Sequence, residues 1–120
     1  MKKEHMEVSP LRQEVTNLHA DVCSALADPT RILILYALSE KPFNVNDLAN
    51  TLGIPQPTAS RHLKVLRDRN LVTATRRGTN VEYVLADHRL IEALDLLRGV
   101  MRDRISQRAN IILEASAEKS

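Results

Sequence analysis

The stretch that decides the fold covers residues 49–66 and reads ANTLGIPQPTASRHLKVL. Gly53 separates two segments whose apolar residues recur at helical spacing. Two short helices joined by a tight turn need a small residue in the first helix, a glycine at the turn and apolar anchors in the second helix. Ala49, Gly53 and Leu63 supply these three features. The stretch therefore predicts a helix-turn-helix.

Two helices are predicted upstream of this stretch. The apolar positions of residues 11–26 recur three and four residues apart, which indicates a helix with Ser9 as its cap and Pro10 in its first turn. Asp28 followed by Pro29 is a strong helix start. The helix that it opens is predicted over residues 29–39, and we expect it to be buried because it is apolar nearly all round.

The helix-turn-helix itself is bounded by capping residues. Asn46 is predicted to cap a short helix over residues 47–52. Gly53 ends that helix, since glycine adopts the left-handed conformation that follows many helices. After Pro55 a further helix is predicted to bury Leu63 and to carry polar residues on the rest of its surface.

Downstream, residues 71–76 and 81–85 are rich in Val, Thr and Tyr and flank Gly78 and Asn80, which predicts a two-stranded hairpin. A long helix follows over residues 88–116, with apolar residues in a near-heptad row. A helix of this length is too long for so small a body to cover. We therefore expect part of its apolar row to face a second copy of the chain.

The expected fold class is mainly α with a small β-hairpin, in the order of four helices, two strands and a final helix. This order is that of a winged helix-turn-helix. With 120 residues, the chain has room for a single domain, residues 1–120. The helices at 9–27 and 88–116 are predicted to form the seam of a homodimer.

Charge is unevenly distributed along the chain. Residues 54–80 contain six basic residues and one acidic residue, a net charge of +5, whereas the whole chain carries +2. A basic patch on a nearly neutral body is typical of a DNA-binding face. Aromatic residues make up only 2% of the chain, so stacking of single-stranded bases on aromatic side chains fits poorly. Double-stranded DNA is the expected partner.

Composition argues against several other classes. We do not expect an enzyme, because the chain lacks a Gly-rich phosphate loop, a recognisable carboxylate pair and a Ser-His-Asp signature. No apolar run is long enough to cross a bilayer, and no signal-peptide core is recognisable, so no membrane partner is expected. Cys23 is the only cysteine, which fits a reducing compartment. We expect a cytoplasmic protein without a cofactor.

Three stretches carry a resemblance: LADPTR at 26–31, QPTASRHLKVL at 56–66, and Leu71-Val72 leading to Arg77-Gly78. Together they resemble the ArsR-type (arsenical-resistance) repressors, a family with many metal and redox sensors, over residues 25–97. The resemblance implies a winged helix-turn-helix regulator that binds DNA. It places the family's base- and phosphate-contacting positions on Gln56, Thr58, Ser60, Arg61, His62 and Lys64, with the wing at Arg76 and Arg77.

The side-chain chemistry of these positions suits DNA. Arg61 can contact guanine through two hydrogen bonds and Gln56 can do the same for adenine, whereas Ser, Thr and Lys are better suited to phosphates. For His62 the alternative is a structural role in helix packing. For Arg67 and Arg69 we favour solvated charge over contact with DNA.

The ligands of two metal sites implied by the resemblance are missing. Residues 44–48 read NVNDL where the family's arsenic-type sensors carry CVCDL, so asparagines replace both thiolates. Asp87 matches the start of the family's second site, but Arg89 stands where a histidine is needed. The sequence therefore predicts no metal at either place.

Other readings stay open. His19 and Cys23 lie four residues apart on one helix face, so a metal- or thiol-responsive sensor at the dimer seam is one alternative, including a disulfide between two copies of Cys23. The competing interpretation makes Cys23 a small buried residue and His19 a surface histidine. A winged-helix module that binds another protein is a second alternative.

The function that the sequence predicts is sequence-specific binding of double-stranded DNA by a homodimeric transcriptional regulator, in the role of a repressor on an inverted repeat. The sequence leaves open the operator, the target genes, the inducing signal and the choice between repression and activation.

Overall fold

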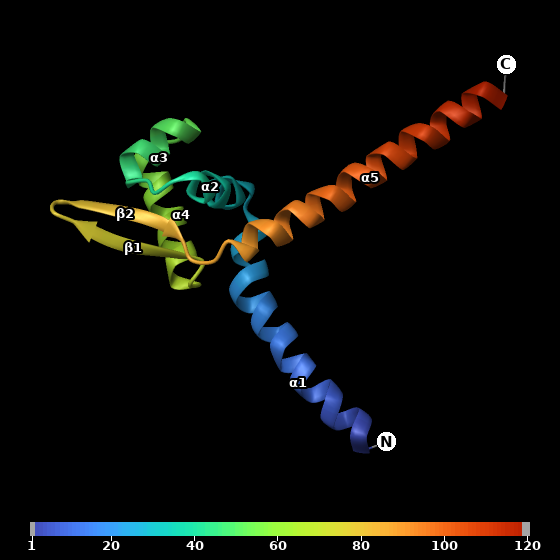
Figure 1. Ribbon diagram of the computed structural model, residues 1–120, viewed down its shortest axis with the longest axis horizontal. Helices are drawn as coiled ribbons and strands as arrows, with labels where there is room; N and C mark the ends of the chain where they lie inside the picture. Colours follow the sequence, from blue (N-terminus) through green and yellow to red (C-terminus); the bar gives the residue numbers. More distant parts are fainter. Residues whose placement is uncertain (1, 119–120) are drawn as a thin grey trace. The chain divides into compact units, whose positions relative to one another are not determined.

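The computed structural model describes the backbone of residues 2–118 and the side chains of residues 9–117. The chain forms two compact units, residues 1–87 and 88–120. Its elements, drawn in Figure 1, are α1 (Lys2–Leu18), the π-helical turn η1 (His19–Cys23), the 3₁₀ turn η2 (Ala25–Ala27), α2 (Pro29–Glu40), α3 (Val45–Leu52), α4 (Gln56–Asp68), β1 (Val72–Arg77), β2 (Asn80–Leu85) and α5 (Arg89–Glu118). The predicted order of helices and strands is confirmed.

Side-chain caps fix where α2 and α3 begin. The Asp28 carboxylate accepts a hydrogen bond from the Thr30 N–H at 2.8 Å, as predicted for the start of α2. The cap of α3 differs from the prediction. Asn44, not Asn46, accepts from the Asp47 N–H at 2.8 Å, so the helix begins two residues earlier than expected. An asparagine can cap only where its own backbone is extended, and Asn44 meets this condition.

The core of the first unit is aliphatic, as the shortage of aromatic residues requires. Its fully buried larger side chains come from α2, α3, α4 and β1 and are Ile34, Leu35, Leu48, Leu63, Leu66 and Val72. The prediction that α2 lies at the centre is confirmed for one side of that helix. Leu33, on its other side, is 56% exposed.

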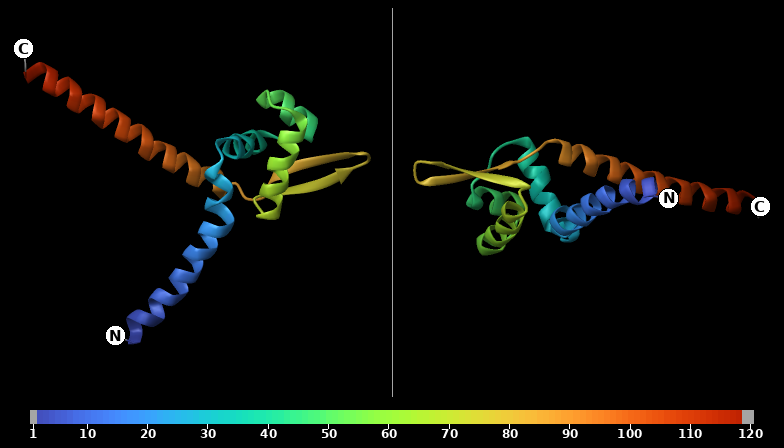
Figure 2. Two further views of the ribbon diagram at one scale, coloured as in Figure 1. Left: turned by 180° about the vertical axis from the view of Figure 1, so that it is seen from behind. Right: turned by 90° about the horizontal axis from the view of Figure 1, so that it is seen from below.

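The two strands form an antiparallel hairpin in which Val72 faces Leu85 and Arg77 faces Asn80. Asn80 therefore belongs to the second strand, and the turn consists of Gly78 and Thr79 alone. Gly78 has a φ of +63°, the left-handed conformation that short hairpin turns require. Both views in Figure 2 show the hairpin extending beyond α4.

The first helix differs from the prediction at both ends. It begins at Lys2, so Pro10 lies inside it rather than in its first turn. Lys, Glu and Met, which favour helices, are frequent before Pro10 and explain the longer helix. It ends at Leu18, because the chain then widens into η1, where the Ser24 N–H donates to the His19 carbonyl oxygen at 3.0 Å.

The second unit consists of α5, which begins one residue later and ends two residues later than predicted. Its exposed face is rich in apolar residues from Leu96 onward: Leu96, Leu97, Val100, Met101, Ile105, Ile111, Ile112 and Leu113 are each at least half exposed. No helix within residues 2–118 has the length and hydropathy needed to span a membrane.

Candidate nucleic-acid interface

The turn between α3 and α4 positions the candidate DNA-reading helix. Gly53 ends α3 with a φ of +67°, and the Ile54 N–H donates to the Ala49 carbonyl oxygen at 3.0 Å. Pro55 follows in an extended conformation and its carbonyl oxygen accepts from the Ala59 N–H at 3.1 Å, the first hydrogen bond of α4. The chain therefore turns over three residues between the two helices, and α4 packs against α3.

The helix α4 has one buried face and one polar face. Ala59, Leu63 and Leu66 are 0% exposed and anchor it to the core. These positions are three and four residues apart and so lie on one face of the helix, and most of the polar residues between them point away from the core. They include Ser60, Arg61 and Lys64, all exposed. A helix held by its apolar face and polar on its outer face has the form required of a helix that enters a DNA groove.

The eight predicted contact residues divide into three groups by exposure. Six are exposed: Gln56, Ser60, Arg61, Lys64, Arg76 and Arg77. Thr58 is half-buried, and His62 is buried, with only 6% of its surface exposed. A buried ring cannot reach a base edge unless α4 moves, so burial favours the helix-packing role that the sequence left open for His62.

His62 packs against the start of α2 through two charged residues. The Nδ1 atom of its ring lies 3.3 Å from an Arg31 guanidinium nitrogen, and its Nε2 atom lies 3.9 Å from the Asp28 carboxylate. Arg31 is itself anchored, because its Nε atom donates to the Ala25 carbonyl oxygen at 2.6 Å. One side chain of α4 is thus joined to the residues that begin α2.

The pKa of Asp28 is lowered from its ordinary value. The largest cause is the hydrogen bond that its carboxylate accepts from the Thr30 backbone N–H. The nearby charges of His62 and Arg31 lower the pKa further, and burial of the group works in the opposite direction. Asp28 is therefore a charged cap at the pH of most cells.

Carboxylates pair with two of the predicted DNA-contacting cations. Lys64 lies 3.2 Å from Asp68 on the same helix, and Arg77 lies 3.5 Å from Glu82 across the hairpin. Within the described part of the chain, Arg61 forms no ion pair. The i,i+4 spacing of Lys64 and Asp68 is a sequence signal for their pairing that net charge alone does not reveal.

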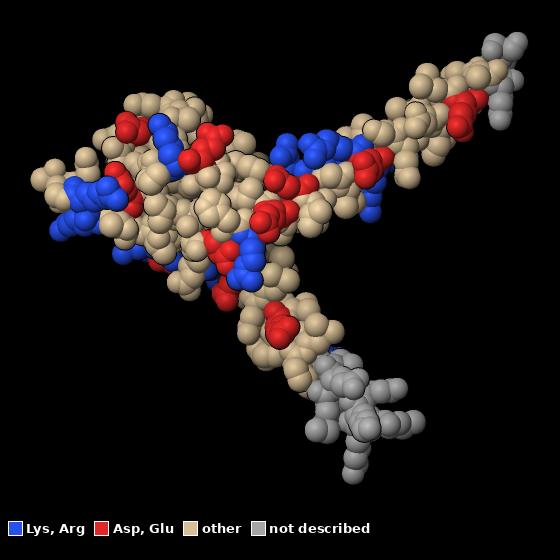
Figure 3. Space-filling model, in the orientation of Figure 1, with Lys and Arg blue, Asp and Glu red and all other residues tan. Residues whose placement is uncertain are grey.

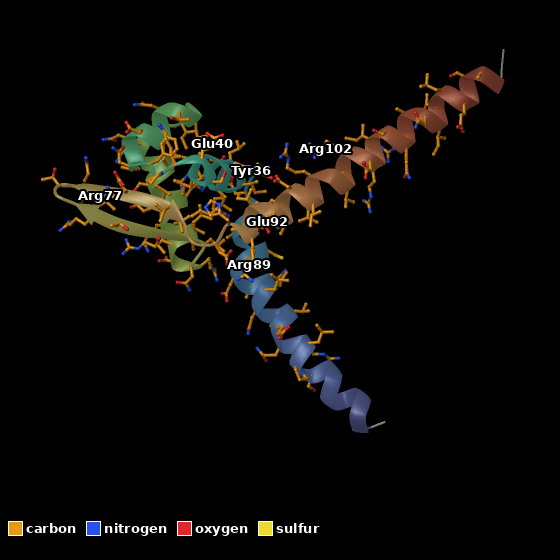
Figure 4. All side chains as sticks on the ribbon, in the orientation of Figure 1. Tyr36, Glu40, Arg77, Arg89, Glu92 and Arg102 are labelled. Carbon is orange, nitrogen blue, oxygen red and sulfur yellow. The ribbon has the colours of Figure 1, made fainter. Side chains whose placement is uncertain are left out.

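The wing carries its basic residues at its free end. Arg76 and Arg77 are the last residues of β1, directly before the turn, and both are exposed. Figure 3 shows Lys and Arg side chains gathered at this end of the hairpin, and Figure 4 shows where Arg77 lies on it. Their position allows contact with a phosphate backbone beside the groove that α4 would occupy.

The residues of the possible sensor sites are placed as follows. Cys23 is exposed, so the expectation of a small buried cysteine is wrong, and His19 is exposed as that interpretation predicted. Asn44 and Asn46, at the positions of the thiolates in the resemblance, lie at the start of α3. Nowhere in the described residues do three or more His, Cys, Asp or Glu side chains gather as a metal site would need.

Residues 28–74, which run from the cap of α2 into β1, match the sequence model described as bacterial regulatory protein, arsR family. The HTH-type transcriptional repressor SmtB of Mycobacterium tuberculosis is 40% identical over 98 residues, which cover 81% of this chain and 73% of SmtB. The chain belongs to the arsR family.

Solved structures agree with this arsR-family membership. The transcriptional repressor BigR from Xylella fastidiosa is 31% identical with a TM-score of 0.64, over 83% of this chain and 96% of BigR. The homodimeric winged helix-turn-helix DNA-binding domain Mb0332 from Mycobacterium bovis has a TM-score of 0.70 at 28% identity, over 80% of this chain and 89% of that domain. The predicted winged helix-turn-helix and the predicted role as a DNA-binding transcriptional regulator are confirmed for this arsR-family chain.

Proposed function

We propose that the chain represses transcription by binding operator DNA as a homodimer, with the polar face of α4 in the major groove and the hairpin against the adjacent backbone. The observation that carries the proposal is the division of α4 into a fully buried apolar face and an exposed face bearing Ser60, Arg61 and Lys64. SmtB and BigR are named as repressors, which favours repression over activation.

The contact set that we propose is narrower than the resemblance implied. Gln56 and Arg61 would read base edges, because both side chains can form paired hydrogen bonds to one base. Ser60, Lys64, Arg76 and Arg77 would contact phosphates. Thr58 is half-buried and would reach only the groove edge, and His62 would hold α4 rather than touch DNA.

A dimer is needed because one module buries little DNA. A single small domain covers about 600–1,000 Å² of its own surface on DNA, which gives weak specific binding. The exposed apolar row of α5, which includes Leu97, Met101 and Ile105, offers a surface for a second copy. In α1, Leu11, Val15 and Leu18 are also more than half exposed. Mb0332, named as homodimeric, favours the same arrangement.

The twofold arrangement predicts the form of the operator. Two α4 helices in successive major grooves lie about 34 Å apart, so the site should be an imperfect inverted repeat. The protein would act in the cytoplasm, since its proposed target is a bacterial chromosome. Asn44 and Asn46 at the start of α3, and Arg89 at the start of α5, stand where the two family metal sites need ligands, so we propose that neither place holds a metal.

The test is selection of duplexes from a random-sequence pool, followed by fluorescence anisotropy with the selected duplex and a scrambled one. We expect selected sequences to contain an inverted repeat and to bind more tightly than the scrambled duplex. Affinity should fall about 10³-fold or more between about 50 and 200 mM salt, because several phosphate counterions are released. Equal affinity for both duplexes, or a weak salt dependence, would contradict the proposal and favour a module that binds another protein.

A further inference from the structure

His62 is the buried polar residue of the described core, and the DNA-contacting role that the resemblance implied for it does not explain its burial. It lies in the middle of α4, one residue from Arg61, and its ring faces the cap of α2. The inference that follows rests on the proposed function, because it concerns how the DNA-reading helix is held.

The contact with Arg31 specifies which nitrogen of the ring carries hydrogen. A guanidinium group only donates hydrogen bonds, so the Nδ1 atom, 3.3 Å away, must accept. A neutral imidazole with an accepting Nδ1 carries its hydrogen on Nε2. That atom faces the Asp28 carboxylate at 3.9 Å, which is beyond the length of a normal hydrogen bond. The geometry therefore fits the neutral ring.

Protonation of the ring would change the contact with Arg31 first. Nδ1 would then carry a hydrogen, lose its acceptor role and face a second cation at 3.3 Å. Arg31 has little freedom to withdraw, since its Nε atom is bonded to the Ala25 carbonyl oxygen. Asp28 would attract the charged ring, but from a greater distance and while already bonded to the Thr30 N–H at 2.8 Å.

The other elements packed against α4 offer no group that would replace the contact with Arg31 when His62 is protonated. α3 carries the exposed Asp47, and β1 carries Arg76 and Arg77 at its far end. Among the described side chains, the polar contacts of the His62 ring are with Arg31 and Asp28, and none is with a group of α3 or β1. Arg31 and Asp28, at the start of α2, are therefore the charged groups that attract or repel the His62 ring.

We infer that neutral His62 is a positioning residue that locks α4 to the start of α2, and that its protonation loosens α4 and weakens DNA binding. Histidine is the side chain that ordinarily changes charge between about pH 5 and pH 8, and this range sets the two pH values of the test. The direction of this effect opposes the general trend, because added positive charge on a protein usually strengthens binding to DNA.

The test measures affinity for a duplex selected by the protein itself, by fluorescence anisotropy at about pH 7.5 and about pH 5.5. For the unaltered protein we expect affinity to be about two- to tenfold weaker at the lower pH, the range that one hydrogen bond accounts for. In His62→Gln the amide oxygen can still accept from Arg31 but cannot be protonated, so the ratio of the two affinities should approach one. His88→Gln, which alters an exposed histidine, should keep the ratio of the unaltered protein.

A second measurement needs neither DNA nor a variant. Long-range ¹H–¹⁵N correlation spectra of the protein should show the His62 hydrogen on Nε2 at about pH 7.5, and amide signals of α4 should shift together with the ring as it is protonated. A hydrogen on Nδ1, or a His62→Gln protein with an unchanged pH ratio, would overturn the inference. Absence of duplex binding at every pH would instead refute the proposed function, and the spectra would still decide whether His62 holds α4.

Discussion

Asp28 serves two elements at once. Its carboxylate caps α2 through the Thr30 N–H, and the same group lies 3.9 Å from His62 of α4. The cap was visible in the sequence as Asp followed by Pro. The contact with His62 was not, because the two residues are far apart in the chain and nothing in either local pattern links them.

The lowered pKa of Asp28 predicts an effect of acid on stability. A carboxyl group whose pKa is lower in the folded than in the unfolded state stabilises the fold above its unfolded pKa, and this contribution is lost as the pH falls through the folded pKa. The unfolded value is near 3.8, so the loss should occur below that pH. Asp28→Asn retains a capping oxygen but cannot ionise. We expect its stability to fall less than that of the unaltered protein when urea unfolding is compared at about pH 6 and about pH 3. Parallel losses in both proteins would contradict this expectation.

Arg61 and Lys64 are both exposed on α4 but should behave differently when removed. If Arg61 binds a base edge, Arg61→Ala should reduce the free energy of binding to the selected duplex by about 1–3 kcal/mol. The reduction for a scrambled duplex should be much smaller. Lys64→Ala should weaken binding to both duplexes equally. It should also reduce the slope of log affinity against log salt concentration by about 1. Anisotropy titrations at several salt concentrations distinguish the two.

Arg102→Ala is the matched control for these variants, because it removes one positive charge from α5, an element that carries none of the proposed contact residues; Figure 4 labels Arg102 on that helix. It should leave the preference for the selected duplex intact. If Arg61→Ala also retained that preference, Arg61 would not be the residue that reads sequence.

At the scale of single elements, Gly53 controls the turn on which the site depends. Its φ of +67° is strained for residues with a Cβ atom, although no atom lies within 4 Å of the place where that Cβ would stand. We expect Gly53→Ala to lower the free energy of unfolding by about 1–2 kcal/mol through backbone strain. Chemical denaturation followed by circular dichroism measures this.

Gly53→Asn is the control for the turn, since asparagine tolerates the left-handed conformation. Asn70 of this chain already adopts it, with a φ of +62°. The asparagine variant should therefore lose less stability than the alanine variant. Equal losses would show that something other than φ is responsible.

Local signals predicted the elements well where one residue type had one physical reason to be there. Asp28, Gly53 and Gly78 were recognised because each meets a backbone requirement that few residues satisfy. The cap of α3 was assigned to Asn46 instead of Asn44, because both are asparagines and only tertiary packing determines which backbone is extended. The break of the first helix at His19 had no local signal, since a π-helical turn has no distinctive composition.

At the scale of the whole molecule, the candidate site was predictable in its charge but not in its burial. The exposure of Arg61 and Lys64 followed from helical spacing against Leu63 and Leu66. His62 broke the pattern because it is a polar residue on the buried face. A family resemblance gives positions that recur in DNA-binding helices, and it does not separate those that touch DNA from those that hold the helix.

Two copies of the chain are needed for the proposed activity, and α5 provides a test. Ile105 is 67% exposed and lies in the apolar row of that helix. Ile105→Glu should give a monomer in analytical ultracentrifugation and weaken binding to the inverted repeat at least about tenfold, because a charge in an apolar interface is costly. Asn110→Glu places the same charge on the other side of α5 and should stay dimeric. A dimeric Ile105→Glu protein would place the seam elsewhere.

The exposed apolar row of α5 has a consequence for gene dosage. Because this apolar surface is buried only against a second copy, the fraction of dimer depends on the concentration of the protein in the cell. When the protein concentration is below the dissociation constant of the dimer, the concentration of dimer rises with the square of the protein concentration. Occupancy of the operator would then respond to a halving of synthesis with up to a fourfold fall. Dilution during growth would therefore act as a signal in its own right, with no ligand required to relieve repression.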